Sequence, residues 1–295
     1  MCIMCASELF SPIAGNSLIA QSAATVVASG DAEIDGLLIG TKWLESTVTY
    51  AFPTVNTGFT TPYEIAPGTY DTGYVFGFVA VSSNFADATS GIFQDIDAMT
   101  GLSFSQSATA DADIVVARTT DSDLPTASGR FPGYSANQGH QWYANHVYEQ
   151  SPTVGSYTWH TILHETGHTL GLAHAHSADS ISGTLSGQVQ PADRDSMEFT
   201  VMSYRPYDGA PLTGYTNETY GFAQSLMMDD IAALHYLYGA DYGADAGDTT
   251  YTFSATTGEM FVDGVGQGTP GANRIFRTLW DGNGNDTYDL SNYST

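Results

Sequence analysis

The sequence predicts an α+β fold, in which a larger body is followed by a small all-β tail. The body contains helical and strand patterns that do not alternate regularly, as βαβ units would. After Ala240 the composition changes to Gly, Asp, Asn and Thr, with short strand patterns such as 274–276. We therefore expect an N-terminal extension or prosegment over residues 1–30, a body over 31–240 and the tail over 241–295.

The elements of the body are predicted from their periodicity. Strand patterns lie at 47–52, 113–118 and, less regularly, 141–147. Helical patterns run from Ser83 to a stop at Gly101, from Tyr157 onward, and over 226–238 before Gly239. The long segment 177–220 has little periodicity and predicts loops.

Charge and cysteine content exclude several classes of protein. Seven basic and 32 acidic residues give a net charge of −25, so we expect no nucleic-acid partner and no anionic membrane surface. The sequence contains no run of about 20 apolar residues, so we expect no membrane insertion. The first basic residue is Lys42, so the start lacks the n-region of a cleaved signal peptide. Cys2 and Cys5 are the only cysteines, which excludes a disulfide framework in the body.

The segment HETGHTLGLAH, which starts at position 164, contains the residues of a metal centre. On a helix that turns ~100° per residue, His164 and His168 lie only ~40° apart, and Glu165 lies on the adjoining flank. Gly171 lets the backbone leave the helix so that His174 can return as a third ligand. Three neutral ligands leave a fourth position open to water, which is typical of a catalytic zinc site.

An alternative interpretation is that this is a solvated or core helix that happens to be rich in histidine. A bare HExxH occurs by chance, but the extended pattern fixes three histidines, a glutamate and a glycine, which favours zinc. We expect the remaining histidines to be surface or core residues rather than ligands: His140, His146, His160, His176 and His235.

These motifs resemble those of the metzincin metalloproteases. The segment matches the metzincin form HExxHxxGxxH, and residues 200–204 (TVMSY) resemble the Met-turn that follows it. Within the metzincins, VMSY and the helix from Met228 with its Leu-Tyr-Gly-Ala ending are similar to the serralysins, which are secreted bacterial proteases followed by calcium-binding repeats. His176 and residues 177–195 depart from the serralysin text. The resemblance implies a metzincin-type catalytic domain with a mixed sheet and an active-site helix, then the start of a glycine-rich RTX β-roll.

The resemblance also implies roles for individual residues. Glu165 is the expected general base, and Met202 the apolar floor beneath the imidazoles. Tyr204 is expected as a fifth, displaceable zinc ligand that then hydrogen-bonds the tetrahedral intermediate; the alternative is a packed tyrosine after a tight turn. The segment 141–147 is expected as the edge strand that pairs with an extended substrate.

The tail predicts a structural calcium site. Residues 281–286 (DGNGND) offer two carboxylates separated by small residues, and oxygen ligands of this kind suit calcium. By resemblance to serralysins, six residues would complete the site: Asp245, Gly247, Thr249, Asp281, Gly284 and Asp286. The alternative is an ordinary Asn-Gly turn.

Together these features predict a secreted zinc-dependent metalloendopeptidase, exported by a bacterial route without a cleaved N-terminal signal. Protein or peptide substrates and a proteinaceous inhibitor are the expected partners, and a monomer is the expected state. The alternatives are a catalytically silent, calcium-dependent binding or adhesion module on the same scaffold, and a zinc hydrolase of non-peptide substrates. A thiol of Cys2 or Cys5 could act as a latency ligand in the cleft; the alternative is that both are inert.

Overall fold

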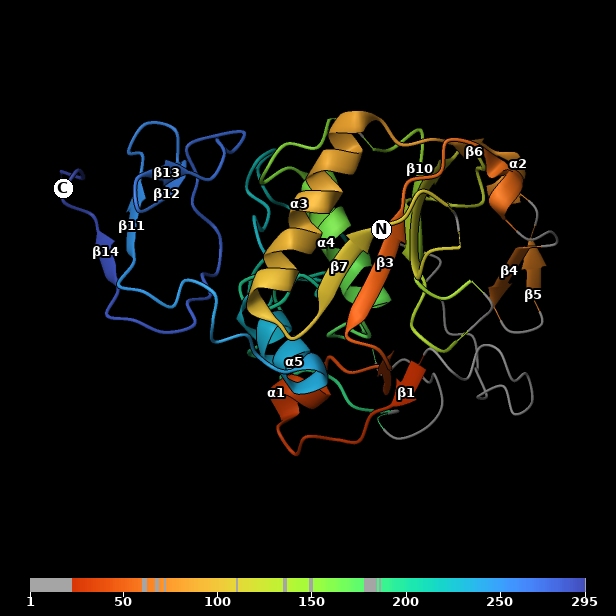
Figure 1. The fold of residues 1–295 in the computed structure, drawn as a ribbon, viewed down its shortest axis with the longest axis horizontal. Coiled ribbons are helices and arrows are strands. Elements are labelled where there is room, and N and C mark those ends of the chain that lie inside the picture. The colour runs from red at the N-terminus through yellow and green to blue at the C-terminus, as the bar shows by residue number, and fades with distance from the viewer. Residues whose placement is uncertain are drawn as a thin grey trace.

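The computed structural model describes residues 23–294, except 60–62, 67–68, 72, 110, 135–136, 149–150, 178–184 and 186. Cys2, Cys5 and most of the expected extension therefore lie outside the described residues. The described chain has the predicted α+β fold, with helices packed beside a mixed sheet and a separate small sheet toward the C-terminus (Figure 1). No helix in these ranges is both long and apolar enough to span a bilayer.

The main sheet of the body has the strand order β7-β3-β8-β10-β9, with β6 paired to β8. Its strands are β3 Thr47–Ala51, β6 Phe78–Val79, β7 Ser103–Gln106, β8 Ile114–Thr119, β9 Ala127–Gly129 and β10 His140–Ala144. Strands β7, β3, β8 and β10 run parallel, while β9 is antiparallel to β10 and β6 is antiparallel to β8. The sheet is therefore mixed, as expected.

The expectation that 141–147 forms an edge strand is wrong. Strand β10 is paired on both sides, to β8 and to β9, and its last four residues are all buried. The chain turns after Ala144, where the N–H groups of Val147 and Tyr148 donate to the Ala144 carbonyl. The edge is instead β9, whose three residues are too few to give a periodic pattern in the sequence.

Three long helices lie within two residues of their predicted positions: α3 Ser83–Met99, α4 Tyr157–Thr169 and α5 Met228–Tyr238. Serine side chains cap two of them, because Ser82 accepts from the Phe85 N–H and Ser156 from the Trp159 N–H. The short elements are α1 Ala32–Asp35, α2 Gly73–Phe76 and the 3₁₀ turn η1 Asn56–Gly58. The described part of 177–220 contains no helix or strand, as predicted.

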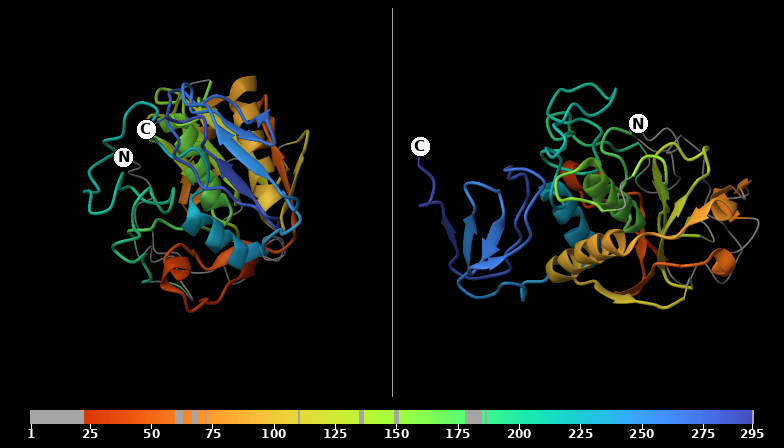
Figure 2. Two further views of the ribbon diagram at one scale, coloured as in Figure 1. Left: turned by 90° about the vertical axis from the view of Figure 1, so that its left-hand side faces the viewer. Right: turned by 90° about the horizontal axis from the view of Figure 1, so that it is seen from above.

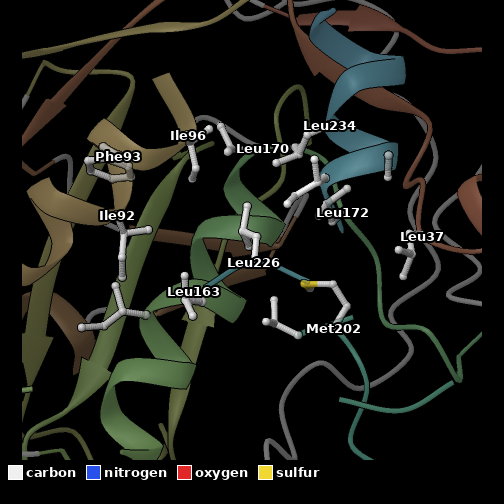
Figure 3. Close-up of a cluster of buried hydrophobic side chains, with 14 of the residues drawn as sticks. Leu37, Ile92, Phe93, Ile96, Leu163, Leu170, Leu172, Met202, Leu226 and Leu234 are labelled. Carbon is white, nitrogen blue, oxygen red and sulfur yellow. The ribbon is translucent and has the colours of Figure 1, made fainter. Parts of the chain in front are cut away.

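The core of the body is packed around α4. Leu163 of this helix and Leu170, which caps its C-terminus, lie between Ile92 of α3 and Leu234 of α5, and each is at most 2% exposed (Figure 3). Burial of one such side chain stabilises the fold by about 1.5–3 kcal/mol, so the helix that carries the histidines is firmly held.

The N-terminal described residues are also part of the body. Strand β1 Ala23–Thr25 pairs antiparallel with β2 Thr41–Trp43, and Val26 is buried in the same core. A further hairpin joins β4 Tyr63–Ala66 to β5 Thr69–Asp71. The domain boundaries at 30 and 240 stay predictions.

The tail forms a four-stranded sheet at one end of the molecule, away from α2 and the β4–β5 hairpin (Figure 2). The strand order is β13-β12-β11-β14, with bounds β11 Thr250–Phe253, β12 Met260–Val262, β13 Val265–Gly266 and β14 Thr287–Asp289.

The strand predicted at 274–276 is wrong. This part of the chain, which we call the strap (residues 274–280), lies along the body instead of pairing within the tail sheet. The Gln224 N–H donates to the Phe276 carbonyl at 2.9 Å, and the Gln224 side chain donates to the Arg274 carbonyl at 2.9 Å. Phe276 and Trp280 pack against the main core, whereas Leu279 packs against the tail cluster and Ile275 is exposed.

Candidate metal centre

Helix α4 places His164 and His168 on one face, one turn apart. Both imidazoles are buried, at 5% and 0% exposed, with ring centroids 4.7 Å apart. The helix ends immediately afterwards, because Gly171 has a φ of 99°, a left-handed conformation that glycine adopts at low cost. The sequence predicted both features.

The chain beyond Gly171 is held so that His174 returns to the helix. Leu172 forms an antiparallel bridge with Leu38, and the Ala173 N–H donates to the Leu37 carbonyl at 2.7 Å. The Nε2 atoms of His168 and His174 come to 3.0 Å from each other. Among the described residues, these three histidines are the only group of three or more His, Cys, Asp or Glu whose ligand atoms converge, all within 4.8 Å.

Backbone carbonyls orient two of the imidazoles. Nδ1 of His164 lies 2.8 Å from the Val201 carbonyl, and Nδ1 of His168 lies 2.8 Å from the Leu172 carbonyl. A carbonyl can only accept, so each Nδ1 carries the proton and each Nε2 presents a lone pair. Burial lowers the pKa of His164 to about 4, which keeps its ring neutral near neutral pH.

The donor set fits a zinc ion. Nε2 of His164 is buried and has no hydrogen-bond partner in the structure. Such an atom is costly to bury unless something binds it. Convergent neutral imidazoles with carbonyl-bound Nδ1 atoms are the arrangement that zinc sites use.

Met202 lies beneath the helix, where an apolar floor was expected. Its side chain is fully buried, and a carbon placed on Gly167 would lie 2.6 Å from its sulfur. Gly167, between the two helical histidines, therefore has to lack a side chain for Met202 to fit. Sequence reasoning missed this requirement, although the glycine stands inside the motif.

Glu165 is 1% exposed and lies against the edge strand β9. A carbon placed on Gly129 would lie 2.6 Å from the Glu165 carbonyl oxygen and 3.2 Å from its Oε2. Strand β9 can run this close to the helix only because Gly129 has no side chain. Sequence reasoning missed Gly129 as well, because the contact joins segments far apart in the chain.

Tyr204 points its hydroxyl at the centre, 3.0 Å from Nε2 of His174. The turn before it is fixed from α5, since the Asp230 carboxylate accepts the N–H groups of Val201 and Met227 at 2.9 and 2.8 Å. Burial raises the pKa of Asp230 to about 7.

A cavity of about 370 Å³ opens beside Glu165, His164 and Tyr204. Its walls are mainly aromatic and include Tyr148, Tyr157, His160, Tyr215 and Phe222. It is large enough for one substrate side chain next to the reacting bond.

The other five histidines lie outside the convergent group. His160, one turn before His164, has its ring 6.4 Å from that residue, and its Nε2 is 3.3 Å from the Tyr215 hydroxyl. His235 is bonded to the Met99 carbonyl. His176 contacts the centre without joining it, as its ring stacks on His174 at 5.5 Å.

In the tail, the two loops of the predicted calcium site lie together. The Thr249 N–H donates to Asp286 at 3.0 Å, and its hydroxyl donates to the Gly247 carbonyl at 3.1 Å. Gly284 passes so close that an added carbon would lie 2.2 Å from that same carbonyl oxygen. Partial desolvation, then the charges of Asp281 and other nearby carboxylates, raise the pKa of Asp245. All six predicted residues therefore belong to one loop cluster.

Comparison with known proteins identifies bacterial relatives of part of the chain. Metallopeptidase AprA of Pseudomonas marginalis is 34% identical over 176 residues, 58% of this chain and 36% of that protein. Serralysin G of Dickeya chrysanthemi is 33% identical over 171 residues, 57% of this chain and 34% of that protein. Serralysin of Proteus mirabilis is 33% identical over 162 residues, 52% of this chain and 30% of that protein. No family model matches the chain.

The mixed α+β fold and the three-histidine centre are those expected of a metzincin-type domain. Within that class the chain is serralysin-like, so the resemblance predicted from its motifs is confirmed over slightly more than half of its length. The chain spans about a third of the length of the curated relatives it matches.

Proposed function

We propose that this chain is a secreted zinc-dependent endopeptidase that hydrolyses peptide bonds in proteins. The observation that carries the proposal is the buried triad of His164, His168 and His174, with Glu165 on the same helix. Relatives named as metalloproteases support it. Secretion, a monomeric state and a proteinaceous inhibitor are part of the same proposal, and rest on the resemblance.

The three imidazoles would hold the ion, which supplies a more acidic water and polarises the peptide carbonyl when it is bound. Glu165 acts as the general base that takes a proton from the attacking water and returns it to the departing amine. Tyr204 hydrogen-bonds the oxygen that gains negative charge in the transition state, and its hydroxyl starts 3.0 Å from a ligand nitrogen.

Strand β9 is the surface on which an extended substrate would lie. Within the part of the chain that the structure describes, β9 is the last strand of the sheet and pairs with β10, and a peptide would add beside it as a further strand through main-chain hydrogen bonds. The close approach of Gly129 to Glu165 supports a substrate position beside the base. Main-chain pairing makes selectivity broad, and the aromatic cavity receives one side chain.

The tail binds structural calcium in this proposal. The support is the clustering of six predicted ligand residues in two adjacent loops. Oxygen donors from carboxylates, carbonyls and a hydroxyl suit a hard cation.

Glu165→Gln tests the function directly. The variant should keep about one zinc per chain, because the ligands are intact, and should cleave denatured casein about 10²–10⁴-fold more slowly, because the base is lost. Zinc content and initial rates give the readout. Near-normal turnover would contradict the mechanism. A zinc-loaded wild-type chain that cleaves no casein would instead favour the binding module.

A further inference from the structure

His176 lies beside the centre and has no role in the proposed mechanism. It stands two positions after His174, where the sequence departs from the serralysin text, and its side chain is half-buried. Its ring lies 4.5 Å from the ring of Tyr204 and 5.5 Å from that of His174, at 44° and 19° between the ring planes.

We propose that His176 is a positioning residue that holds Tyr204 in its place beside the metal centre. This inference rests on the proposed role of Tyr204. The Tyr204 ring lies closer to His176 than to His174, at 4.8 Å, or to His164, at 5.8 Å. Its shortest distance to another ring in the centre is therefore to a residue outside the convergent triad.

The backbone on both sides of the contact is fixed. The Ala175 N–H donates to the Met202 carbonyl at 3.3 Å, and the Ala175 carbonyl accepts from the Gln190 N–H at 2.9 Å. The chain that carries His176 is therefore tied to the turn that carries Tyr204. His176 can therefore hold a constant position relative to Tyr204, because the hydrogen bond from Ala175 to Met202 couples the two loops.

The contact between His176 and Tyr204 orients the tyrosine hydroxyl toward the metal centre. Tyr204 points its hydroxyl to within 3.0 Å of Nε2 of His174, while its ring packs on His176. A tyrosine that must leave the centre and return during each cycle needs a defined resting position. An aromatic contact of this kind changes an equilibrium by roughly two- to tenfold, which biases the position without locking it.

The experiment compares His176→Ala and His176→Phe with wild type, with Tyr204→Phe as the reference for loss of the phenol. His146→Ala is the matched control, since His146 is exposed and belongs to neither loop. Protein reconstituted with copper(II) should show a phenolate-to-metal absorption that Tyr204→Phe removes. Zinc content and melting temperature are measured on the same samples.

His176→Ala should keep its zinc, lose much of that absorption and show kcat reduced about two- to tenfold with KM nearly unchanged. His176→Phe retains a ring and should restore both. If Tyr204→Phe removes the absorption while His176→Ala leaves it and kcat unchanged, the role of His176 is overturned and that of Tyr204 stands. If Tyr204→Phe changes neither readout, both roles fail. Loss of zinc from His176→Ala would also overturn the proposal, since the residue would then serve metal retention.

Discussion

The two metal sites proposed for this chain are built in opposite ways. In the body, three neutral imidazoles are buried on a helix and a braced turn, and two of them are oriented by carbonyls. In the tail, carboxylates such as Asp245 and Asp286 are exposed on loops with few hydrophobic neighbours. The first site is organised by the protein core, and the second by its own hydrogen bonds.

This difference has an energetic meaning. Neutral imidazoles do not repel one another strongly, so the body can hold its geometry before metal binds. The carboxylates of the tail repel one another. Desolvation is the larger cause of the raised pKa of Asp245, and the charges of the neighbouring carboxylates are the second. A cation removes that repulsion. We therefore expect zinc to control activity and calcium to control stability.

The largest effect should follow from removing a zinc ligand. His168→Ala should lower the zinc content from about one per chain to near zero and abolish casein cleavage, because two imidazoles hold zinc far less well than three. Metal analysis after dialysis is the measurement. His146→Ala, an exposed histidine, should keep both zinc and activity; equal zinc loss in the two variants would contradict the assignment.

Calcium should act on the melting curve. Millimolar calcium added to calcium-free protein should stabilise it by about 2–3 kcal/mol at a hundredfold excess over the dissociation constant. Asp286→Ala should reduce this gain without changing the zinc content, because its carboxylate joins the two loops. If calcium does not change the melting temperature of the wild-type chain, the proposed calcium site in the tail is contradicted.

The contact between β9 and α4 tests how tightly the body holds its centre. Gly129→Ala should cost about 1–3 kcal/mol of unfolding free energy, and it should reduce activity, since the added carbon meets the Glu165 backbone. Gly91→Ala is the control, because that glycine lies within α3 and has open space around it. The control should gain about 0.5–1 kcal/mol. Denaturant unfolding of both variants measures the difference in unfolding free energy. A Gly129 variant as stable as the control would show that β9 can move away from α4.

The smallest expected effect is a pH dependence at Asp230. Its folded-state pKa is raised from 3.8 to about 7, so its protonated form favours the folded state. This stabilisation is complete below pH 3.8 and is lost as the pH rises through 7. Asp230→Asn resembles the protonated form, so from pH 6 to pH 8 the variant should lose less stability than wild type, by on the order of 1 kcal/mol. Urea unfolding of zinc-loaded protein at the two pH values measures it; parallel pH profiles would refute the assignment.

Sequence patterns predicted the features that depend on local spacing. The helix that carries His164 and His168, the exit at Gly171 and the clustering of the Asp281 and Asp245 loops follow from short-range patterns and resemblance. The edge strand β9 and the fit of Gly167 over Met202 depend on contacts between distant segments. Neither leaves a periodic signal, so neither could be read from the chain. The strand predicted in the strap is wrong for a related reason, since Phe276 packs against the core of the body, which is distant in sequence.

The strap sets an order of events during synthesis. Phe222 lines the cavity, and Gln224, two residues later, holds Trp159 of α4 through its carbonyl and the strap through its amide groups. A chain that has emerged only to the end of α5 lacks the strap residues that Gln224 binds. We therefore expect the cavity wall to be completed only once the strap has been made. A chain that reaches only the end of α5 would carry its histidines but not yet a finished cleft.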